Sequence, residues 1–449
     1  MWVAAHSAGQ CTTVLAAPDS ASQPSIVLDQ SDGRMRMTST QDELTLDQVD
    51  LFNPDNYVSG MPHDQLTLLR TQAPVFRHPD PGRAEGHWAI TRHADVVFVS
   101  RNPELFSSER ETCFLFDTPE DQMAQQRLMM INMDPPGHTG LRSLVNRGFT
   151  PRMIGKLEER IADACDDIVR KAVEQGEGDF VTMCAAELPL VVIAELMGVP
   201  QEDRHKLFHW SNLMLSGDDP EVVASPEVQE QTSLEVYAYA NELGANKRDC
   251  PVDDIVSKLI SPDENGHSLT ELEFDLFFVL LMVAGNETTR NAISGGIQAF
   301  VENPDQWKLL KARPELISSA ADEIVRWVTP VVDFRRTTTR DVEVGGTLIR
   351  AGEKVIIYYA SANRDESVFT DPFRFDITRD PNPHIGFGGG GPHFCLGRHL
   401  AKLEIERMLA ALITHVDTIE ITGPVRRLRS HFINGIKSMP VRLTPADGS

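Results

Sequence analysis

The stretch Pro383-His-Ile-Gly-Phe-Gly-Gly-Gly-Gly-Pro-His-Phe-Cys-Leu-Gly397 places six glycines and one cysteine directly before a helical pattern. Glycines let a backbone approach a bulky flat group closely and adopt positive φ angles. A thiolate that faces a helix N-terminus is stabilised by free backbone amides and by the helix dipole. The stretch therefore predicts a metal-bound thiolate at Cys395, and the plainer alternative is a flexible loop beside an inert buried cysteine.

A second stretch breaks the local rules of a buried helix. The segment Phe277-Phe-Val-Leu-Leu-Met-Val-Ala-Gly-Asn-Glu-Thr-Thr-Arg290 begins as an apolar core helix and then places a glycine and four polar residues in its interior. An interior glycine costs roughly 1 kcal/mol relative to alanine, and a buried polar group without a partner costs about 1–3 kcal/mol. Such a combination indicates a functional site, the alternative being a helix that is kinked and exposed here.

Two pairs of charged side chains stand at helical spacing. Glu323 and Arg326 lie at positions i and i+3, which alone is typical of a weak surface ion pair. His138 and Arg142 are four residues apart in a helix that Pro136 starts, so they share one face. Each pair by itself is weak evidence for a site.

Taken together and in this order, the patterns resemble the cytochrome P450 family. Gly389, Gly391, His393, Cys395 and Gly397 match the haem-binding loop of that family, G-x-G-x-H-x-C-x-G. The resemblance covers about residues 50 to 445 and rests on five separated motifs, the other four being D-P-P-x-H-x-x-x-R from 134, A-G-x-E-T-T from 284, E-x-x-R from 323 and F-R-F-D from 373. One departure is Phe387, which lies eight residues before Cys395 instead of the commonest seven.

The resemblance implies a mainly α fold with a small β region, in which a triangular prism of helices surrounds a buried haem b. Dioxygen would be the co-substrate. Residues 46–449 would form a single catalytic domain. Residues 1–45 are rich in Ser, Thr, Gln and Asp with little periodicity, and we expect a disordered leader there.

The resemblance also assigns roles to individual residues. Cys395 would be the axial ligand of the iron, and its electron-rich sulfur favours cleavage of the O–O bond. Thr288 would donate a hydrogen bond to the activated dioxygen, while Glu287 would relay protons through water. Glu323 and Arg326 would form a structural network with a residue of the 374–385 loop and so hold the cysteine loop in place. The residues expected to contact the haem or its propionates are His138, Arg142, Ala284, Gly285, Arg336, Phe387, Gly389, His393 and Gly397.

Periodicity in the rest of the chain supports a predominantly helical protein. Apolar residues recur at three- and four-residue spacing, which predicts helices over 153–174, 186–198, 228–248, 270–300, 314–328 and 396–415. Alternating or β-branched runs predict strands at 74–76 and 87–91, a hairpin within 341–360 and a strand-rich tail over 428–443.

The composition, 41% hydrophobic and 24% charged, is that of an ordinary globular protein. A net charge of −24 argues against a general affinity for nucleic acid. The six cysteines include no CxxC pair, so neither a zinc site nor a disulfide framework is indicated. Because no apolar run approaches the roughly 20 residues of a membrane span and the start lacks a signal-peptide pattern, we expect a cytoplasmic protein without a membrane anchor.

The segments that line the substrate pocket in this family are mostly apolar in this chain. The residues expected to line it are Phe114, Phe116, Leu213, Val283, Val331, Val332, Phe334, Phe432 and Ile433. An apolar pocket with few polar anchors suits a lipid-like ligand such as a methyl-branched fatty acid or an isoprenoid. The strings 284–291 and 432–437 resemble the branch that hydroxylates methyl-branched lipids, sterol side chains or monoterpenes. Within that branch we favour terminal hydroxylation of a methyl-branched lipid, with sterol or monoterpene hydroxylation as the alternative.

Electrons would have to come from a separate ferredoxin and its reductase, because the chain carries no fused flavin or ferredoxin module. Arg398, Lys402 and Arg407 form a candidate basic patch for an acidic ferredoxin, or else a solvated helix face. Three other functions stay open at this point. They are a peroxygenase that uses hydrogen peroxide directly, a haem protein that binds a gas or ligand without chemistry, and a coupling enzyme for phenolic or peptide substrates.

Overall fold

The structure, a computed structural model, describes residues 44–223, 225–250, 255–262 and 266–446. The predicted leader over 1–45 therefore lies outside the described residues, except for its last two. The α-helices are α1 (His63–Gln72), α2 (His93–Arg101), α3 (Glu120–Gln126), α4 (Gly137–Asn146), α5 (Pro151–Gln175), α6 (Glu187–Met197), α7 (Arg204–Leu215), α8 (Pro226–Asp249), α9 (Ile255–Ile260), α10 (Glu271–Glu302), α11 (Pro304–Ala312), α12 (Ile317–Val328), α13 (Tyr359–Ala362) and α14 (Arg398–His415).

The largest sheet has five strands in the order β1-β2-β8-β5-β3, where β2 and β8 are parallel and the other neighbours antiparallel. Smaller sheets pair β12 with β4 and with β9, β10 with β11, and β6 with β7. The strands are β1 (Val75–Asp80), β2 (Arg83–Ile90), β3 (Phe106–Ser107), β4 (Glu177–Asp179), β5 (Asp333–Thr338), β6 (Val342–Val344), β7 (Thr347–Ile349), β8 (Lys354–Tyr358), β9 (Val416–Ile421), β10 (Arg426–Arg427), β11 (Ile436–Ser438) and β12 (Pro440–Pro445).

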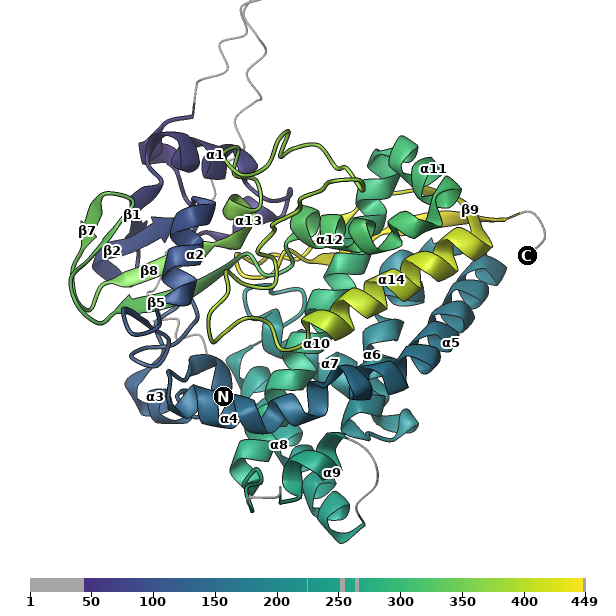
Figure 1. The fold of residues 1–449 in the computed structure, drawn as a ribbon, viewed down its shortest axis with the longest axis horizontal. Coiled ribbons are helices and arrows are strands. Elements are labelled where there is room, and N and C mark those ends of the chain that lie inside the picture. Colours follow the sequence, from purple (N-terminus) through teal and green to yellow (C-terminus); the bar gives the residue numbers. More distant parts are fainter. Residues whose placement is uncertain (1–43, 224, 251–254, 263–265, 447–449) are drawn as a thin grey trace, which may run out of the picture.

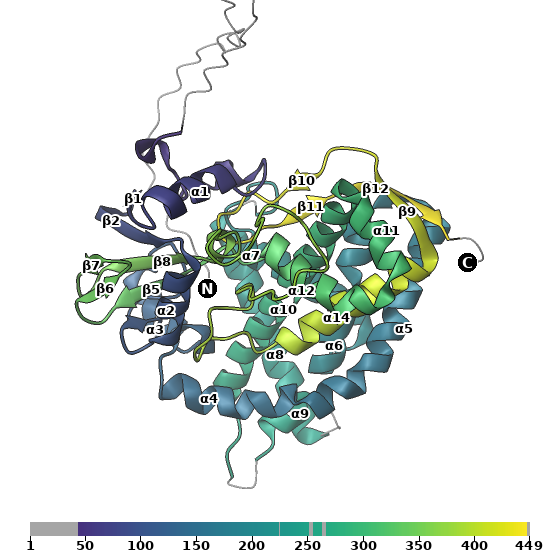
Figure 2. The same cartoon turned by 45° about the horizontal axis from the view of Figure 1, so that its top comes forward.

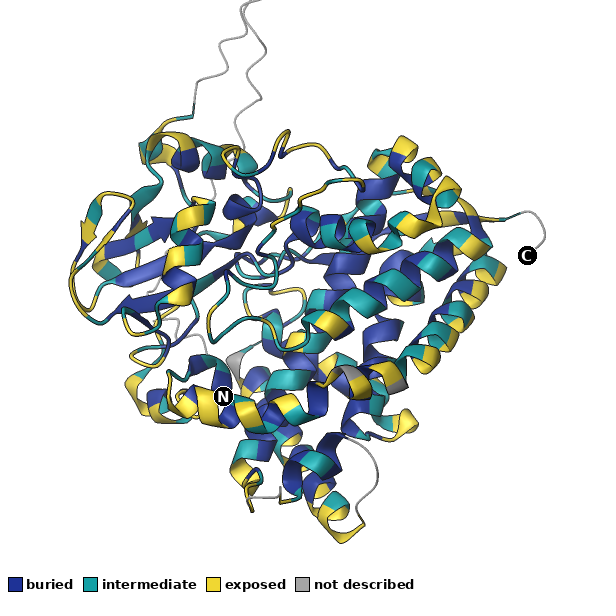
Figure 3. Cartoon of the chain, viewed as in Figure 1, coloured by how far each residue is buried: buried dark blue, intermediate teal, exposed yellow. Residues whose placement is uncertain are grey.

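The predicted mainly α fold is confirmed. The helices fill most of a roughly triangular outline, and the five-stranded sheet lies at one corner (Figure 1). α10 passes through the middle of the molecule and contacts α6, α7, α8, α12 and α14. The view in Figure 2 shows α12 and α14 lying along one side of it. α10 is dark blue over most of its surface in Figure 3, as expected for a helix that is apolar on nearly all sides.

Most predicted elements are present with shifted ends. The six predicted helices correspond to α5, α6, α8, α10, α12 and α14, and the predicted hairpin is β6 and β7, after which β8 enters the large sheet. The tail over 428–443 is strand only from β11 onward, because residues 428–435 form a loop that crosses toward Val331. Within the described ranges, no helix combines the length and the hydropathy that crossing a bilayer requires.

Residues of β8 show how the sheet is packed. Val355 and Ile357 belong to one buried apolar cluster, whereas Ile356 and Tyr358 belong to another on the opposite face. Successive side chains of a strand point to opposite faces, so a fully apolar strand requires cover on both sides. The sheet is therefore a rigid support for Arg336 on the neighbouring strand β5.

Candidate active site

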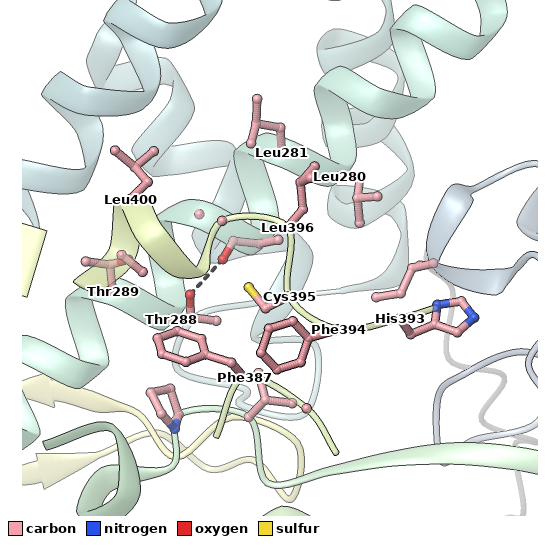
Figure 4. A pocket seen from close by; sticks show the side chains of 18 of the residues that line it. Leu280, Leu281, Thr288, Thr289, Phe387, His393, Phe394, Cys395, Leu396 and Leu400 are labelled. Atoms are coloured by element: carbon pink, nitrogen blue, oxygen red, sulfur yellow. Dashed lines mark hydrogen bonds between the residues drawn. The ribbon is translucent and has the colours of Figure 1, made fainter. Parts of the chain in front are cut away.

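A cavity of about 260 Å³ lies between α10 and the loop that precedes α14. Its lining comes from segments far apart in the sequence, including α4, α6, α10, β5 and the cysteine loop. Figure 4 shows the Cys395 sulfur between Thr288 of α10 and the rings of Phe387 and Phe394. The structure thus brings the predicted metal ligand and the predicted oxygen-handling helix to the same cavity.

Backbone hydrogen bonds fix the loop around Cys395. The Cys395 amide donates to the carbonyl oxygen of Phe387 at 2.9 Å, and the Gly388 amide donates to Ile385 at 2.9 Å. α14 then begins at Arg398, two residues after the predicted start at Leu396. Cys395 therefore faces the N-terminus of α14, as the sequence predicted.

Two glycines of the loop allow it to pack closely on α2. A Cβ on Gly389 would lie 2.6 Å from the hydroxyl of Ser100, and one on Gly391 would lie 2.3 Å from the Ser100 carbonyl oxygen. Gly391 also has φ +77°, which favours glycine. Gly389 does not line the cavity, so the expected contact of Gly389 with the cofactor is replaced by close packing on α2.

A buried ion pair ties this loop to α12, as predicted for the E-x-x-R motif. Arg326 donates twice to the Glu323 carboxylate at 2.7 Å, and both side chains are fully buried. Glu323 also accepts from Arg379 at 3.2 Å and from Asn382 at 3.1 Å. Arg379 lies within the predicted 374–385 loop, and Asn382 directly precedes the cysteine stretch. The network therefore anchors the approach to Cys395.

The polar turn of α10 divides between two sides of the helix. Ala284, Gly285 and Thr288 line the cavity, and the Thr288 hydroxyl donates to the Ala284 carbonyl oxygen at 2.7 Å. Glu287 does not line it; the carboxylate turns to the other side and pairs with Arg290. Burial raises the pKa of Glu287, and the Arg290 charge acts in the opposite direction. Glu287, the predicted acid, therefore follows cavity residues in the sequence, but its side chain points away from the cavity.

A smaller apolar cavity of about 70 Å³, which we call the apolar channel, adjoins the first and shares Ala284, Thr288 and Val331 with it. Six predicted pocket residues line it: Phe114, Val283, Val331, Phe334, Phe432 and Ile433. Phe432 stands between Phe114 and Phe334, with ring centroids 5.6 and 5.5 Å apart. Among the described side chains that line this channel, only Thr288 carries a hydroxyl, amide or charged group.

Three predicted pocket residues lie elsewhere. Phe116 packs edge-on against Phe52 and His431, with centroids 5.1 and 5.0 Å away. Val332 is fully buried in the core of the sheet, because it follows Val331 in extended backbone and points the other way. Leu213 misses the channel and Leu215 lines it, since residues two apart on α7 face nearly opposite directions.

Much of the cavity wall was not predicted from the sequence. Several of these residues stand one or two helical turns from predicted ones, so helical periodicity alone could have found them: Phe277, Leu280, Leu281, Ala292, Leu400, Ala401 and Glu404. Cys113 and Met130 lie in the 110–130 segment that also holds the predicted Phe114 and Phe116. Others come from distant segments and gave no signal in the sequence: Phe149, Ile193, Leu196 and Tyr359. The cavity is consequently more apolar than the motifs alone indicate.

Comparison with known proteins identifies the family. The model of the family described as cytochrome P450 matches residues 193–432. A steroid C26-monooxygenase of Rhodococcus jostii is 47% identical over 408 residues, which cover 89% of this chain and 85% of that protein. The chain belongs to the cytochrome P450 family.

Two further P450 relatives extend the comparison. A methyl-branched lipid omega-hydroxylase of Mycobacterium tuberculosis is 41% identical over 388 residues, covering 84% of this chain and 90% of that protein. A solved Mycobacterium marinum cytochrome P450 in complex with pseudoionone matches with a TM-score of 0.83 at 38% identity, covering 90% of this chain and 100% of that chain. P450 enzymes are monooxygenases whose haem iron is held by a cysteine thiolate, so the predicted cofactor is confirmed at the level of the family.

Two cysteines of this P450 line the haem cavity, and only one has the surroundings of a thiolate ligand. Burial raises the pKa of Cys113 to about 12 although the charges of Arg336 and Arg335 act in the opposite direction, and Cys113 does not precede a helix N-terminus. Burial also raises the pKa of Cys395, but backbone amides of Gly397 and Arg398 and the Arg142 charge act in the opposite direction. Donors directed at sulfur favour the thiolate form that metals bind. The chemistry of the site therefore fits Cys395 as the ligand.

The predicted propionate ligands converge on one side of the cavity, which His138, Arg142, Arg336 and His393 all line. The two imidazole rings are 4.3 Å apart, and the buried Nδ1 of His138 has no hydrogen-bond partner among the described residues. Burial and the neighbouring arginines lower the pKa of His138 to about 4 and hold the pKa of His393 well below its usual value. In the described chain neither Arg142 nor Arg336 has a carboxylate partner; each donates to a backbone carbonyl. Such uncompensated charge fits the two carboxylates of a haem.

The candidate basic patch on α14 is largely neutralised by the chain itself. Lys402 binds Asp322 at 2.7 Å, and Arg407 pairs with Glu158. Arg398 has no carboxylate partner within the described residues, and its guanidinium lies 5.3 Å from the centre of the Phe394 ring. Of the three predicted cations, only Arg398 is free to meet an acidic partner.

Proposed function

We propose that this P450 hydroxylates the methyl end of a branched alkyl chain on an apolar substrate, with steroid side chains as the first class and methyl-branched lipids as the second. The observation that carries the proposal is the small apolar cavity at Thr288, whose described lining presents no polar anchor beyond that hydroxyl. A steroid C26 position and the omega carbon of a methyl-branched lipid are both methyl ends of such chains. The relative named for steroids has the higher identity, 47% against 41%.

The residues that hold the haem follow from the cavity. We place Cys395 on the iron, and His138, Arg142, Arg336 and His393 on the propionates, where each carboxylate gains charge-assisted hydrogen bonds. When bound, the haem supplies the iron at which dioxygen is activated and one oxygen atom is inserted into a C–H bond.

The chain's own contribution to the chemistry is a hydroxyl and an acid on one turn of α10. Thr288 points into the cavity and donates to the Ala284 carbonyl oxygen, so its hydroxyl is oriented and its oxygen is able to accept a hydrogen bond. Glu287 is buried and holds a proton more readily than an exposed carboxyl. We assign Thr288 to hydrogen bonding near the reacting oxygen and Glu287 to proton supply, which is general-acid work.

The substrate proposal predicts selective binding of an alkyl chain. A sterol-type steroid with an intact branched side chain should shift the haem from low to high spin with a Kd at least about tenfold below that of the same steroid without its side chain, because only the chain reaches the apolar channel. Val283→Phe, which fills the channel, should abolish the difference.

Phe116→Leu is the matched control, since Phe116 lies outside the channel, and it should retain the preference. A titration monitored at the Soret band, followed by mass spectrometry of the product, measures both points. Equal affinities for the two steroids, together with tight binding of a methyl-branched fatty acid, would move the assignment to the second class. Equal affinities for all three compounds would contradict the proposal.

We propose that a ferredoxin is the electron donor and that Arg398 contacts it. We also propose that the protein acts in the cytoplasm. Arg398→Gln should slow reduction by an acidic ferredoxin several-fold at low salt and less at high salt, because screening removes the attraction between exposed charges. Lys402→Gln should have a smaller effect, since Asp322 already neutralises that lysine. Stopped-flow reduction measures both, with dithionite as the control reductant. An Arg398→Gln effect that is independent of salt would contradict the contact.

A further inference from the structure

A buried histidine beside the apolar channel joins two of the segments that form its walls. Nδ1 of His431 lies 3.4 Å from the Asp333 carboxylate of β5, and Nε2 lies 3.6 Å from the Asp218 carboxylate in the loop that follows α7. His431 is 3% exposed, and its ring stands nearly perpendicular to the ring of Phe116, with centroids 5.0 Å apart. Each ring nitrogen thus faces one carboxylate, and the two carboxylates belong to different segments of the chain.

The three residues of this cluster all stand close to channel-lining residues in the sequence. His431 directly precedes two of these lining residues, Asp333 lies between two others, and Asp218 follows a fifth; in that order they are Phe432, Ile433, Val331, Phe334 and Leu215. The first two segments are already joined through the backbone, since the Val332 amide donates to the Phe432 carbonyl oxygen at 2.9 Å. The contact of His431 with Asp218 adds the loop that continues from Leu215.

The Asp333 carboxylate requires a cation. It is fully buried, its Oδ1 has no hydrogen-bond partner, and within the described chain His431 is the only basic side chain paired with it. An unpaired buried charge is strongly unfavourable, so the site favours a protonated imidazole. Burial lowers the pKa of His431, but the Asp333 and Asp218 carboxylates raise it by more, and the smaller opposing effect of Lys354 leaves the pKa above its ordinary value.

Other contacts of the same loop keep their charge near neutral pH. Lys437 of β11 pairs with Asp219 at 2.8 Å and with Glu221 at 2.6 Å, and the Arg429 amide donates to Asp219 at 3.1 Å. Lysine stays charged well above neutral pH, whereas an ordinary histidine loses its charge at about pH 6.5. Loss of the His431 proton therefore releases one contact and leaves the loop attached.

We propose that His431 is a positioning residue whose charged imidazole clamps the loop after α7 to β5 and so sets the width of the apolar channel around the alkyl end of the substrate. The inference rests on the proposed function, in which that channel holds the alkyl chain. With His431 charged, Leu215 is held in the channel wall and the methyl end is confined near Thr288. With His431 neutral, Asp218 is no longer attracted, so the wall loosens and fewer restraints fix which carbon lies near Thr288.

Steroid titrations at two pH values test the clamp in the haem-loaded enzyme. The Kd of a steroid with its branched side chain should rise at least about threefold from about pH 6 to about pH 9, because His431 loses its charge as the pH rises through its raised pKa. The fraction of product hydroxylated at the methyl end should fall over the same range. The same steroid without its side chain should bind equally at both pH values, since it does not reach the channel.

Asp218→Asn removes the carboxylate of the loop and keeps the buried pair of His431 and Asp333. It should bind the side-chain steroid at least about threefold more weakly than the wild type at about pH 6, with no further loss at about pH 9. Glu221→Gln is the matched control, because Glu221 lies on the same loop but pairs with Lys437, and it should keep the wild-type pH dependence. A wild-type Kd that does not change with pH, or an Asp218→Asn variant with the wild-type pH dependence, would overturn the proposal.

A second readout needs no substrate. The ring carbon resonance of His431 in carbon-13-labelled protein, identified by its loss in His431→Asn, reports the titration of the imidazole. Asp218→Asn should move the midpoint downward by at least about half a pH unit, because the lost carboxylate stabilised the cation. An unchanged midpoint would overturn the clamp. Equal affinities for the two steroids at every pH would instead show that the proposed function is wrong, and the midpoint then tests the clamp on its own.

Discussion

Arg326→Ala is expected to lower the free energy of unfolding by about 3–5 kcal/mol and to release haem, because it breaks a buried ion pair from one side. The change leaves Glu323 buried with one fewer cation. It also removes the donor to three backbone carbonyl groups, those of Asn363, Pro372 and Arg374, which lie 2.9 to 3.1 Å from the guanidinium. Asn363 in turn accepts from the Ile385 amide at 2.8 Å, so the disturbance reaches the cysteine loop directly.

Denaturant unfolding and the haem-to-protein ratio after gel filtration measure the two effects. Arg442→Ala is the matched control, since Arg442 also pairs with two carboxylates, Glu177 and Glu420, but is 49% exposed. Exposed pairs contribute at most about 1 kcal/mol, so that variant should retain haem. Similar losses in the two variants would show that the E-x-x-R network is not the anchor of the loop.

Cys395→Ala is expected to abolish hydroxylation while leaving a folded protein. The variant removes the thiolate that we place on the iron, where it would donate electron density, but it leaves intact the charge cluster on the propionate side and the Arg326 network. Cys113→Ala is a matched control within the same cavity, because Cys113 is buried and its pKa is raised to about 12. Product formation measured by mass spectrometry should be lost in the first variant and retained in the second.

The parts of the site that could be predicted are short contiguous patterns. The cysteine loop, the polar turn of α10 and the Glu323–Arg326 pair each act mainly on neighbours in the sequence, so spacing and chemistry were sufficient. Helices and strands could be assigned for the same reason, because their periodicity is a local pattern in the sequence. The strict spacing from His138 to Arg142 placed both on one face of α4, and the structure directs that face to the cavity.

The parts that could not be predicted depend on which way a side chain points. Leu213 and Leu215, Val331 and Val332, and Glu287 and Thr288 are close pairs in which one member lines a cavity and the other does not. The phase of a helix or strand is set by packing against distant segments, which a single sequence does not contain. The predicted contact of Gly389 with the cofactor is a related case. The close neighbour of Gly389 is α2, a segment distant in the sequence.

The absorption spectrum of the reduced carbonyl complex tests the central claim most directly, because the position of the Soret band reports whether a thiolate is bound to the iron. The wild-type protein and Cys113→Ala should both show the strongly red-shifted band of thiolate ligation, and Cys395→Ala should lack it. A wild-type complex without the red shift, or a red shift that persists in Cys395→Ala, would contradict the assignment of Cys395.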